Sequence, residues 1–245
     1  MGGRNMIPKK IHYCWFGGNP IPDKEKRCIE SWKKFCPDYE IIEWNETNYN
    51  LQANRYMADA YKEKKWGFVP DYARFDIIYN HGGFYLDTDV ELVKSLDELL
   101  DNQAYMGFEG GIWVNGGIGF GAEAGDTTIK KLRDMYDEKS FYKEDGSLNL
   151  TPSPHYITEM LVSMGLKRND KMQKVETLMI YPSEYFAAKN YETGKVYCTG
   201  NTISIHQYTA SWQTPKERMK MRIKRIIGER SYQCLFSLYK KIKRG

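Results

Sequence analysis

The stretch "HGGFYLDTDVELV", residues 81–93, constrains this chain most, because an apolar run leads directly into two aspartates one residue apart. Buried carboxylates cost free energy unless they are paired, hydrogen-bonded or bound to a cation. On a continuous strand Asp87 and Asp89 would project to the same side, since strand residues two apart share a face. The stretch therefore predicts a place where negative charge is gathered to meet a cation.

The segments before this stretch predict alternating strands and helices. "KKIHYCWFGG" is apolar on both faces, as in parallel sheets buried by helices, and "YEIIEW" predicts a second strand. Helices are predicted over residues 22–36, over "QANRYMADAYKEKK" and over "VPDYARFDIIYNHGG", where Pro70 opens the helix and Gly82 follows its end. This alternation indicates a doubly wound α/β sheet, in which ligands bind outside the carboxyl ends of the strands.

The pattern is less regular beyond residue 100. "YMGFEG" and "VNGGIGFGA" predict strands around glycine turns, helices are predicted near 126–138 and 154–164, and "TISIHQYTASW" predicts a late strand. No repeat or linker interrupts the chain. We therefore expect a single domain over residues 6–214, followed by a basic helical tail over residues 215–245.

The cysteines and the first residues indicate the compartment. The five cysteines are odd in number and widely spread, with no C-x-x-C pair, which argues against a disulfide framework and a structural zinc site. "MGGRNMIPKK" has no apolar signal region, and no run approaches the ~18 apolar residues of a membrane-spanning helix. We expect a cytoplasmic protein.

The net charge of +4 hides an asymmetry. Residues 215–245 carry eleven Lys and Arg against two acids, a net +9, so the rest of the chain carries −5. Basic amphipathic helices bind anionic membrane surfaces, so this tail predicts peripheral contact with the inner face of the cell membrane. The alternative is that its apolar residues pack on the domain. A non-enzymatic polyanion-binding protein also stays open, although no nucleic-acid-binding motif accompanies the tail and we expect no nucleic acid as partner.

Two chemistries use the letters "LDTD". Mn²⁺ and Mg²⁺ prefer carboxylate oxygens and are often held by one or two carboxylates plus substrate phosphates, a role for Asp87 and Asp89. The rival is a haloacid-dehalogenase-like phosphatase, in which the first aspartate of D-x-D-x-[TV] is a phosphoryl nucleophile. Glu91 stands at the fifth position here, so the phosphatase is the weaker alternative.

Four further residues can be structural or functional. Asp71 and Arg74 are spaced for an ordinary i,i+3 ion pair, or for holding a phosphate or sugar hydroxyl. Trp15 can belong to the core or offer a flat face to a nucleobase. His206 is an ordinary hydrogen-bonded histidine unless the fold brings it to Asp89.

Three blocks together, "IPKKIHYCWFGG", "DYARFDIIYNHGGFYLDTDVELVKSLDELL" and "HQYTASW", resemble glycosyltransferase family 32 and, more distantly, the catalytic domains of the clostridial glucosylating toxins. The resemblance covers most of residues 6–212. It implies a GT-A type nucleotide-diphospho-sugar transferase fold with a mostly parallel central sheet. It also implies retaining, Mn²⁺- or Mg²⁺-dependent transfer of galactose, N-acetylgalactosamine or glucose from a UDP-sugar to a glycan or lipid-linked glycan, as in capsule or lipopolysaccharide synthesis.

The resemblance implies donor-binding roles for residues of the first two blocks and the middle of the chain. Trp15 would stack on the uracil, and Asp71 with Arg74 would hold the donor sugar and its phosphates. Tyr85 would line the donor pocket. Asn115 resembles a polar residue near the transferred sugar.

It also implies a metal site and a lid. Asp87 would contact the ribose, and the metal through water, whereas Asp89 would bind the metal directly. His206 resembles the third, C-terminal metal ligand. Ser211 and Trp212 resemble a lid element that touches the β-phosphate.

Overall fold

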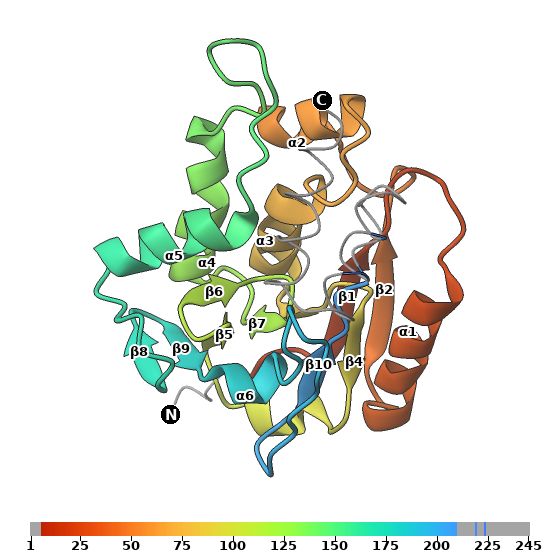
Figure 1. Ribbon diagram of the computed structural model, residues 1–245, viewed down its shortest axis with the longest axis vertical. Coiled ribbons are helices and arrows are strands. Elements are labelled where there is room, and N and C mark those ends of the chain that lie inside the picture. Colours follow the sequence, from red (N-terminus) through yellow and green to blue (C-terminus); the bar gives the residue numbers. More distant parts are fainter. Residues whose placement is uncertain (1–5, 210–218, 220–222, 224–245) are drawn as a thin grey trace, which may run out of the picture.

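The predicted α/β class is confirmed by the computed structural model, which describes residues 6–209 together with Met219 and Ile223. An eight-stranded sheet is covered by helices on both faces, and a separate two-stranded sheet lies beside it (Figure 1). Within these described ranges no helix has both the length and the apolar character needed to cross a membrane.

The large sheet has the strand order β2-β1-β3-β7-β5-β9-β8, with β6 paired to β5. Strands β1, β2, β3, β5 and β9 run in one direction, and β6, β7 and β8 run against them. The predicted mostly parallel sheet is thus confirmed. The strand bounds are β1 (Lys10–Cys14), β2 (Glu40–Trp44), β3 (Gly83–Tyr85), β4 (Val90–Leu92), β5 (Ala104–Glu109), β6 (Trp113–Asn115), β7 (Phe120–Ala122), β8 (Gln173–Val175), β9 (Leu178–Tyr181) and β10 (Ser204–His206).

The helices follow the predicted segments closely. Asn54 caps α2 by accepting a hydrogen bond from the backbone N–H of Met57, and Gly82 ends α3 with a φ of 62°, a conformation that favours glycine. The helix bounds are α1 (Asp23–Phe35), α2 (Arg55–Lys62), α3 (Pro70–His81), η1 (Leu96–Leu99), α4 (Thr127–Asp134), η2 (Met135–Glu138), α5 (Ser153–Ser163) and α6 (Ser183–Phe186).

The expectation that the two aspartates share one strand face is wrong. Strand β3 ends at Tyr85, and Asp87 and Asp89 lie in a turn in which the N–H of Val90 donates to the carbonyl of Asp87 at 3.0 Å. The chain then leaves the large sheet, because β4 pairs antiparallel with β10 in the two-stranded sheet. A turn does not alternate its side chains as a strand does, so the two carboxylates are free to meet different partners.

Residues 166–200 contain elements that the sequence pattern does not predict. Strand β9 pairs parallel with β5 inside the large sheet, and β8 pairs antiparallel with β9. Both strands are short, and only β9 alternates between buried and partly exposed residues over its full length.

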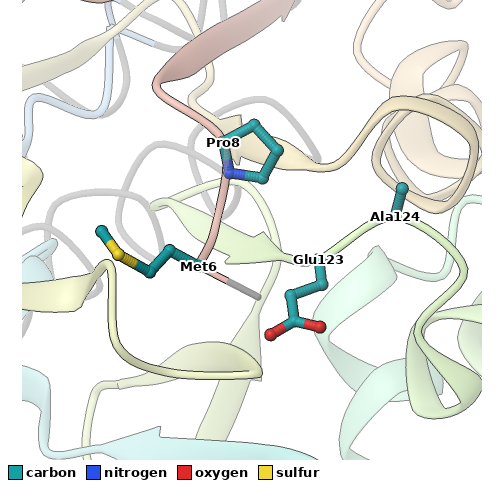
Figure 2. Close-up of a pocket in the computed structure, with 4 residues that line it drawn as sticks. All are labelled: Met6, Pro8, Glu123 and Ala124. Atoms are coloured by element: carbon teal, nitrogen blue, oxygen red, sulfur yellow. The ribbon is translucent and has the colours of Figure 1, made fainter. Parts of the chain in front are cut away.

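A hollow of about 240 Å³ opens at the edge of the sheet where β1 begins. It is lined by Met6, Pro8, Glu123 and Ala124 (Figure 2). Because ligands of such sheets bind at the carboxyl ends of the parallel strands, this hollow lies at the opposite edge from the predicted site.

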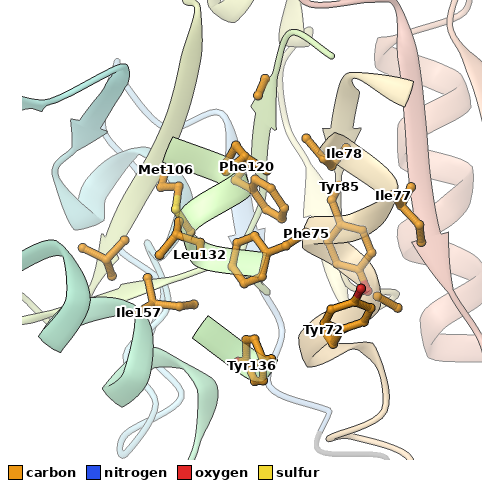
Figure 3. Close-up of a cluster of buried hydrophobic side chains, with 14 of the residues drawn as sticks. Tyr72, Phe75, Ile77, Ile78, Tyr85, Met106, Phe120, Leu132, Tyr136 and Ile157 are labelled. Carbon is orange, nitrogen blue, oxygen red and sulfur yellow. The ribbon is translucent and has the colours of Figure 1, made fainter. Parts of the chain in front are cut away.

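Two cores hold the layers together, one on each face of the sheet. Helices α2 to α5 cover the first core, in which Phe75 of α3 and Phe120 of β7 lie with ring centroids 5.2 Å apart (Figure 3). Helix α1 covers the second core with Trp32. Neighbouring residues of β3 divide between them, since Phe84 packs into the second core and Tyr85 into the first. The whole of β3 is therefore buried, and its close packing on both faces fixes the position of the turn that follows it.

Candidate active site

The charged residues gather where strands β3, β5 and β10 end. Asp87 and Asp89 follow β3, Glu109 is the last residue of β5, and His206 is the last residue of β10. The antiparallel pairing of β4 with β10 places Val90 opposite His206, so the histidine lies next to the aspartate turn. The fold thus brings His206 to Asp89.

Arg74 lies between two of the acids. Its guanidinium is 3.2 Å from Asp71 Oδ1 and 3.5 Å from Asp87 Oδ1, and its Nε donates to the carbonyl of Pro70 at 3.2 Å. The ring of Tyr85 lies against it, with the guanidinium carbon 5.3 Å from the ring centroid. Arg74 thus holds Asp87 in place through a charge-assisted contact.

Burial separates these residues into an accessible and an inaccessible layer. The side chain of Asp87 is 30% exposed, whereas Asp71, Arg74 and Tyr85 are almost fully buried. Burial raises the pKa of Asp71 to about 7, against the opposing effect of Arg74. Tyr85 is consequently a buried neighbour of Arg74 and Asp87, and Asp87 is the most exposed member of this group.

A second cation lies between the other two acids. Nε2 of His206 is 3.3 Å from Asp89 Oδ1, and its Nδ1 is 2.9 Å from Glu109 Oε1. Although burial lowers the pKa of His206, the carboxylates of Asp89 and Glu109 raise it to about 10. His206 is therefore an imidazolium at neutral pH in this structure, with a carboxylate at each nitrogen.

Thr209 fixes the other oxygen of Asp89 and is itself held by Glu25, and the sequence pattern assigns neither of them. The backbone N–H of Thr209 donates to Asp89 Oδ2 at 2.9 Å, and the Thr209 hydroxyl donates to Glu25 Oε1 at 2.7 Å. Helix α1, the aspartate turn and the segment after β10 meet at this threonine. Thr209 lies within "HQYTASW", the block that also contains His206.

Asn115 lies beside this charge network with both ends of its amide occupied. Its Nδ2 donates to Glu109 Oε2 at 2.9 Å, and its Oδ1 accepts from the N–H of Gly117 at 2.7 Å. Gly117 also packs directly on Asp87, since a Cβ at Gly117 would lie 2.3 Å from Asp87 Oδ2. This glycine lets the backbone approach the carboxylate closely.

Of the remaining residues predicted to bind the donor, the structure describes Trp15 and does not describe Ser211 and Trp212. Trp15 follows β1 and is partly exposed, with its Nε1 donating to the carbonyl of Asn19 at 2.6 Å. The predicted lid residues Ser211 and Trp212, and most of the basic tail, lie outside the residues that the structure describes.

The residues present fit a cation that is shared with a ligand. Asp87 and Asp89 supply carboxylate oxygens at one edge of the sheet, and His206 would add an imidazole nitrogen once its Nε2 proton has been released to solvent. Among the described residues, however, no group of three or more His, Cys, Asp and Glu could hold a metal ion by itself. A cation at this site would therefore need further ligand oxygens from substrate phosphates and water, as Mg²⁺ has in sites built on one or two carboxylates.

Comparisons with known proteins show what this chain is similar to. Residues 22–106 match the family described as "Glycosyltransferase sugar-binding region containing DXD motif". Inositol phosphoceramide mannosyltransferase 3 of Schizosaccharomyces pombe is 34% identical over 112 residues, which are 41% of this chain and 29% of that protein. Subversion of eukaryotic traffic protein A of Legionella pneumophila is 26% identical over 117 residues, 36% of this chain and 18% of that protein. The chain thus matches less than a third of the length of either relative.

A solved structure shares the fold. PaToxG Glycosyltransferase superposes with a TM-score of 0.50 at 18% identity, covering 65% of this chain and 70% of that one. The GT-A type fold is thereby confirmed. Residues 22–106 match a glycosyltransferase sugar-binding region with the DXD motif, and the predicted resemblance to glycosyltransferase family 32 is confirmed.

Proposed function

We propose that this chain is a metal-dependent, retaining glycosyltransferase that moves a hexose from a UDP-sugar to a glycan or lipid-linked glycan. The observation that carries the proposal is the convergence of Asp87, Asp89 and His206 at the carboxyl edge of the sheet. The match of residues 22–106 to the DXD sugar-binding region supports it.

In this proposal Asp87, Asp89 and His206 hold Mn²⁺ or Mg²⁺ together with the donor diphosphate. When bound, the cation would neutralise the charge that develops on the departing diphosphate. Asp71 and Arg74 lie below the surface, so their burial supports an orienting role behind Asp87. Trp15 offers its partly exposed ring to the base, and Ser211 with Trp212 are assigned to the lid by resemblance alone.

Retention is proposed to occur by front-face attack. The acceptor hydroxyl oxygen bonds to the anomeric carbon as the bond from that carbon to the diphosphate oxygen breaks, and the hydroxyl proton passes to the departing phosphate oxygen. Asn115 is assigned to the face where the transferred sugar lies. Its amide is held by Glu109 and Gly117, which supports a fixed orientation toward a ligand.

The relatives bear on the sugar and the acceptor. Three Schizosaccharomyces pombe relatives are named inositol phosphoceramide mannosyltransferases. These names support a lipid-linked acceptor and add mannose to galactose, N-acetylgalactosamine and glucose as sugars to test. A place in capsule or lipopolysaccharide synthesis is part of the proposal.

The basic tail is proposed to hold a cytoplasmic enzyme on the inner face of the membrane. The support is the net +9 of residues 215–245, because each cation near an anionic surface contributes on the order of 1 kcal/mol. Flotation with anionic liposomes tests it: the full chain is expected to float and a chain ending at Thr214 to stay behind. Equal recovery of the two would refute membrane contact through the tail.

The activity is tested with a panel of nucleotide sugars and Mn²⁺, with nucleotide release as the measurement. The proposal expects release from one UDP-sugar, lost in Asp89→Ala and kept in Asp145→Ala, which removes an exposed carboxylate from a turn. Release that is equal in all three proteins refutes the assigned site. Hydrolysis of a simple phosphomonoester that depends on Asp87, without nucleotide release, would favour the phosphatase.

A further inference from the structure

Glu109 connects two residues that the proposed function places on opposite sides of the reaction. Its Oε1 is 2.9 Å from Nδ1 of His206, and its Oε2 accepts from Nδ2 of Asn115 at 2.9 Å. Each carboxylate oxygen therefore has a different partner. One partner is an assigned metal ligand, and the other is assigned to the transferred sugar.

Both partners are fixed at their far ends as well. Nε2 of His206 lies 3.3 Å from Asp89, and Oδ1 of Asn115 accepts from the N–H of Gly117 at 2.7 Å. If the amide of Asn115 flipped, it would lose the hydrogen bond from Gly117. If the ring of His206 rotated away from Glu109, its Nε2 would also move away from Asp89. Glu109 is thus the central member of a chain of contacts that runs from Gly117 to Asp89.

The position of Glu109 in the fold suits such a role. It ends β5, which lies inside the large sheet and pairs with β6, β7 and β9. His206, by contrast, belongs to the two-stranded sheet. A carboxylate from the rigid sheet consequently holds a ring from the smaller one.

We propose that Glu109 is a positioning residue that sets the orientation of His206 toward the metal and of Asn115 toward the sugar, and so couples the two sides of the site. The inference rests on the proposed function, in which His206 is a metal ligand. A carboxylate on the second nitrogen of a metal-binding histidine fixes the ring and its tautomer, and losing it costs roughly 10- to 100-fold in metal affinity.

Glu109→Gln is the decisive substitution, because it keeps the shape and leaves one acceptor oxygen in place of two. The new amide can accept from His206 or from Asn115, and not from both. Glu40→Gln is the matched control, since Glu40 is exposed on β2 at the opposite edge of the sheet. Circular dichroism and urea unfolding establish that both variants fold.

The measurement is Mn²⁺ affinity in the presence of UDP, from the electron paramagnetic resonance signal of free Mn²⁺. Glu109→Gln is expected to weaken binding roughly 10- to 100-fold, and Glu40→Gln to leave it unchanged. The effect of Glu109→Gln on Mn²⁺ affinity is then measured a second time in a protein that also carries His206→Ala. A residue that acts through His206 has no further effect there, so Glu109→Gln is expected to leave the affinity of His206→Ala unchanged.

Two results overturn the coupling while leaving the proposed function in place. One is wild-type Mn²⁺ affinity in Glu109→Gln, and the other is an equal loss with and without His206. A wild-type protein that binds no Mn²⁺ with UDP is a different result, because it removes the metal-dependent function and the coupling with it.

Discussion

Oδ1 of Asp89 and Nε2 of His206 lie 3.3 Å apart, although one belongs to the turn after β3 and the other to β10. With Glu109 at its other nitrogen, His206 gives two largely buried carboxylates a shared positive charge. Removing one member of a buried ion pair leaves an uncompensated charge, which is strongly destabilising. The histidine therefore stabilises the metal-free protein, apart from its proposed role in metal binding.

His206→Ala is expected to lower the free energy of unfolding of the metal-free protein by about 3 kcal/mol. Urea unfolding at neutral pH measures it. His155→Ala is the control, because His155 is exposed and stacks on Trp113, and it is expected to cost about 1 kcal/mol. Equal losses in the two variants would contradict the ion-pair assignment.

Gly117→Ala is expected to abolish nucleotide release with little loss of stability. The added Cβ would lie 2.3 Å from Asp87 Oδ2, so the carboxylate has to move. Steady-state release of UDP and thermal unfolding are the two measurements. Gly200→Ala is the matched control, because a Cβ there meets nothing within 4 Å, and activity retained in Gly117→Ala would argue against the assigned position of Asp87.

Arg74→Met is expected to destabilise the protein by about 3–5 kcal/mol, since Asp71 and Asp87 would lose the cation that lies between them. Chemical denaturation is the measurement. Arg168→Met removes a guanidinium paired with the exposed Glu159, and it is expected to cost less than about 1 kcal/mol. Similar losses of unfolding free energy in the two variants would show that the buried ion pairs of Arg74 do not stabilise the protein more than an exposed pair does.

Two buried groups are expected to give opposite pH dependences of stability. Burial lowers the pKa of His12 to about 4, below its ordinary 6.5, so its contribution is present above pH 6.5 and is lost as pH falls toward 4. Burial raises the pKa of Asp71 from 3.8 to about 7, so its contribution is present at low pH and is lost as pH rises through 7. In the wild type the two effects oppose each other between about pH 4 and 6.5.

Each group is isolated by substituting the other. Relative to wild type, the stability of Asp71→Asn is expected to gain about 1.4 kcal/mol per pH unit over this range, and that of His12→Gln to lose about as much. Urea midpoints at half-unit pH intervals measure both slopes. Parallel curves for all three proteins would contradict the shifted pKa values of both groups.

The sequence predicts the first half of the fold well, because each element there carries its own local signal. Residues 70–81 begin with proline and end before two glycines, and the structure has α3 over Pro70–His81. Residues 173–181 carry no comparable signal, since β8 and β9 are three and four residues long and their place is set by pairing with β5. Pairing with a distant strand leaves little trace in a local pattern.

The site shows the same division. Asp87 and Asp89 are recognisable because two acids follow an apolar run, but their separate partners depend on a turn that strand periodicity does not anticipate. Glu109 could have been predicted as a site residue, because the predicted strand "YMGFEG" also ends in an acid. What the sequence lacked was the pairing that brings β10 beside β4.

That pairing has a consequence for how the protein is made. A ribosome delivers residues from the amino terminus, so the large sheet and the aspartate turn emerge well before Ser204–His206. Only when β10 has paired with β4 do Asp89 and Glu109 receive the imidazole that joins them. A nascent chain can therefore complete its large sheet before His206 reaches Asp89 and Glu109, and the proposed metal site is assembled only with β10, the last strand in the part of the chain that the structure describes.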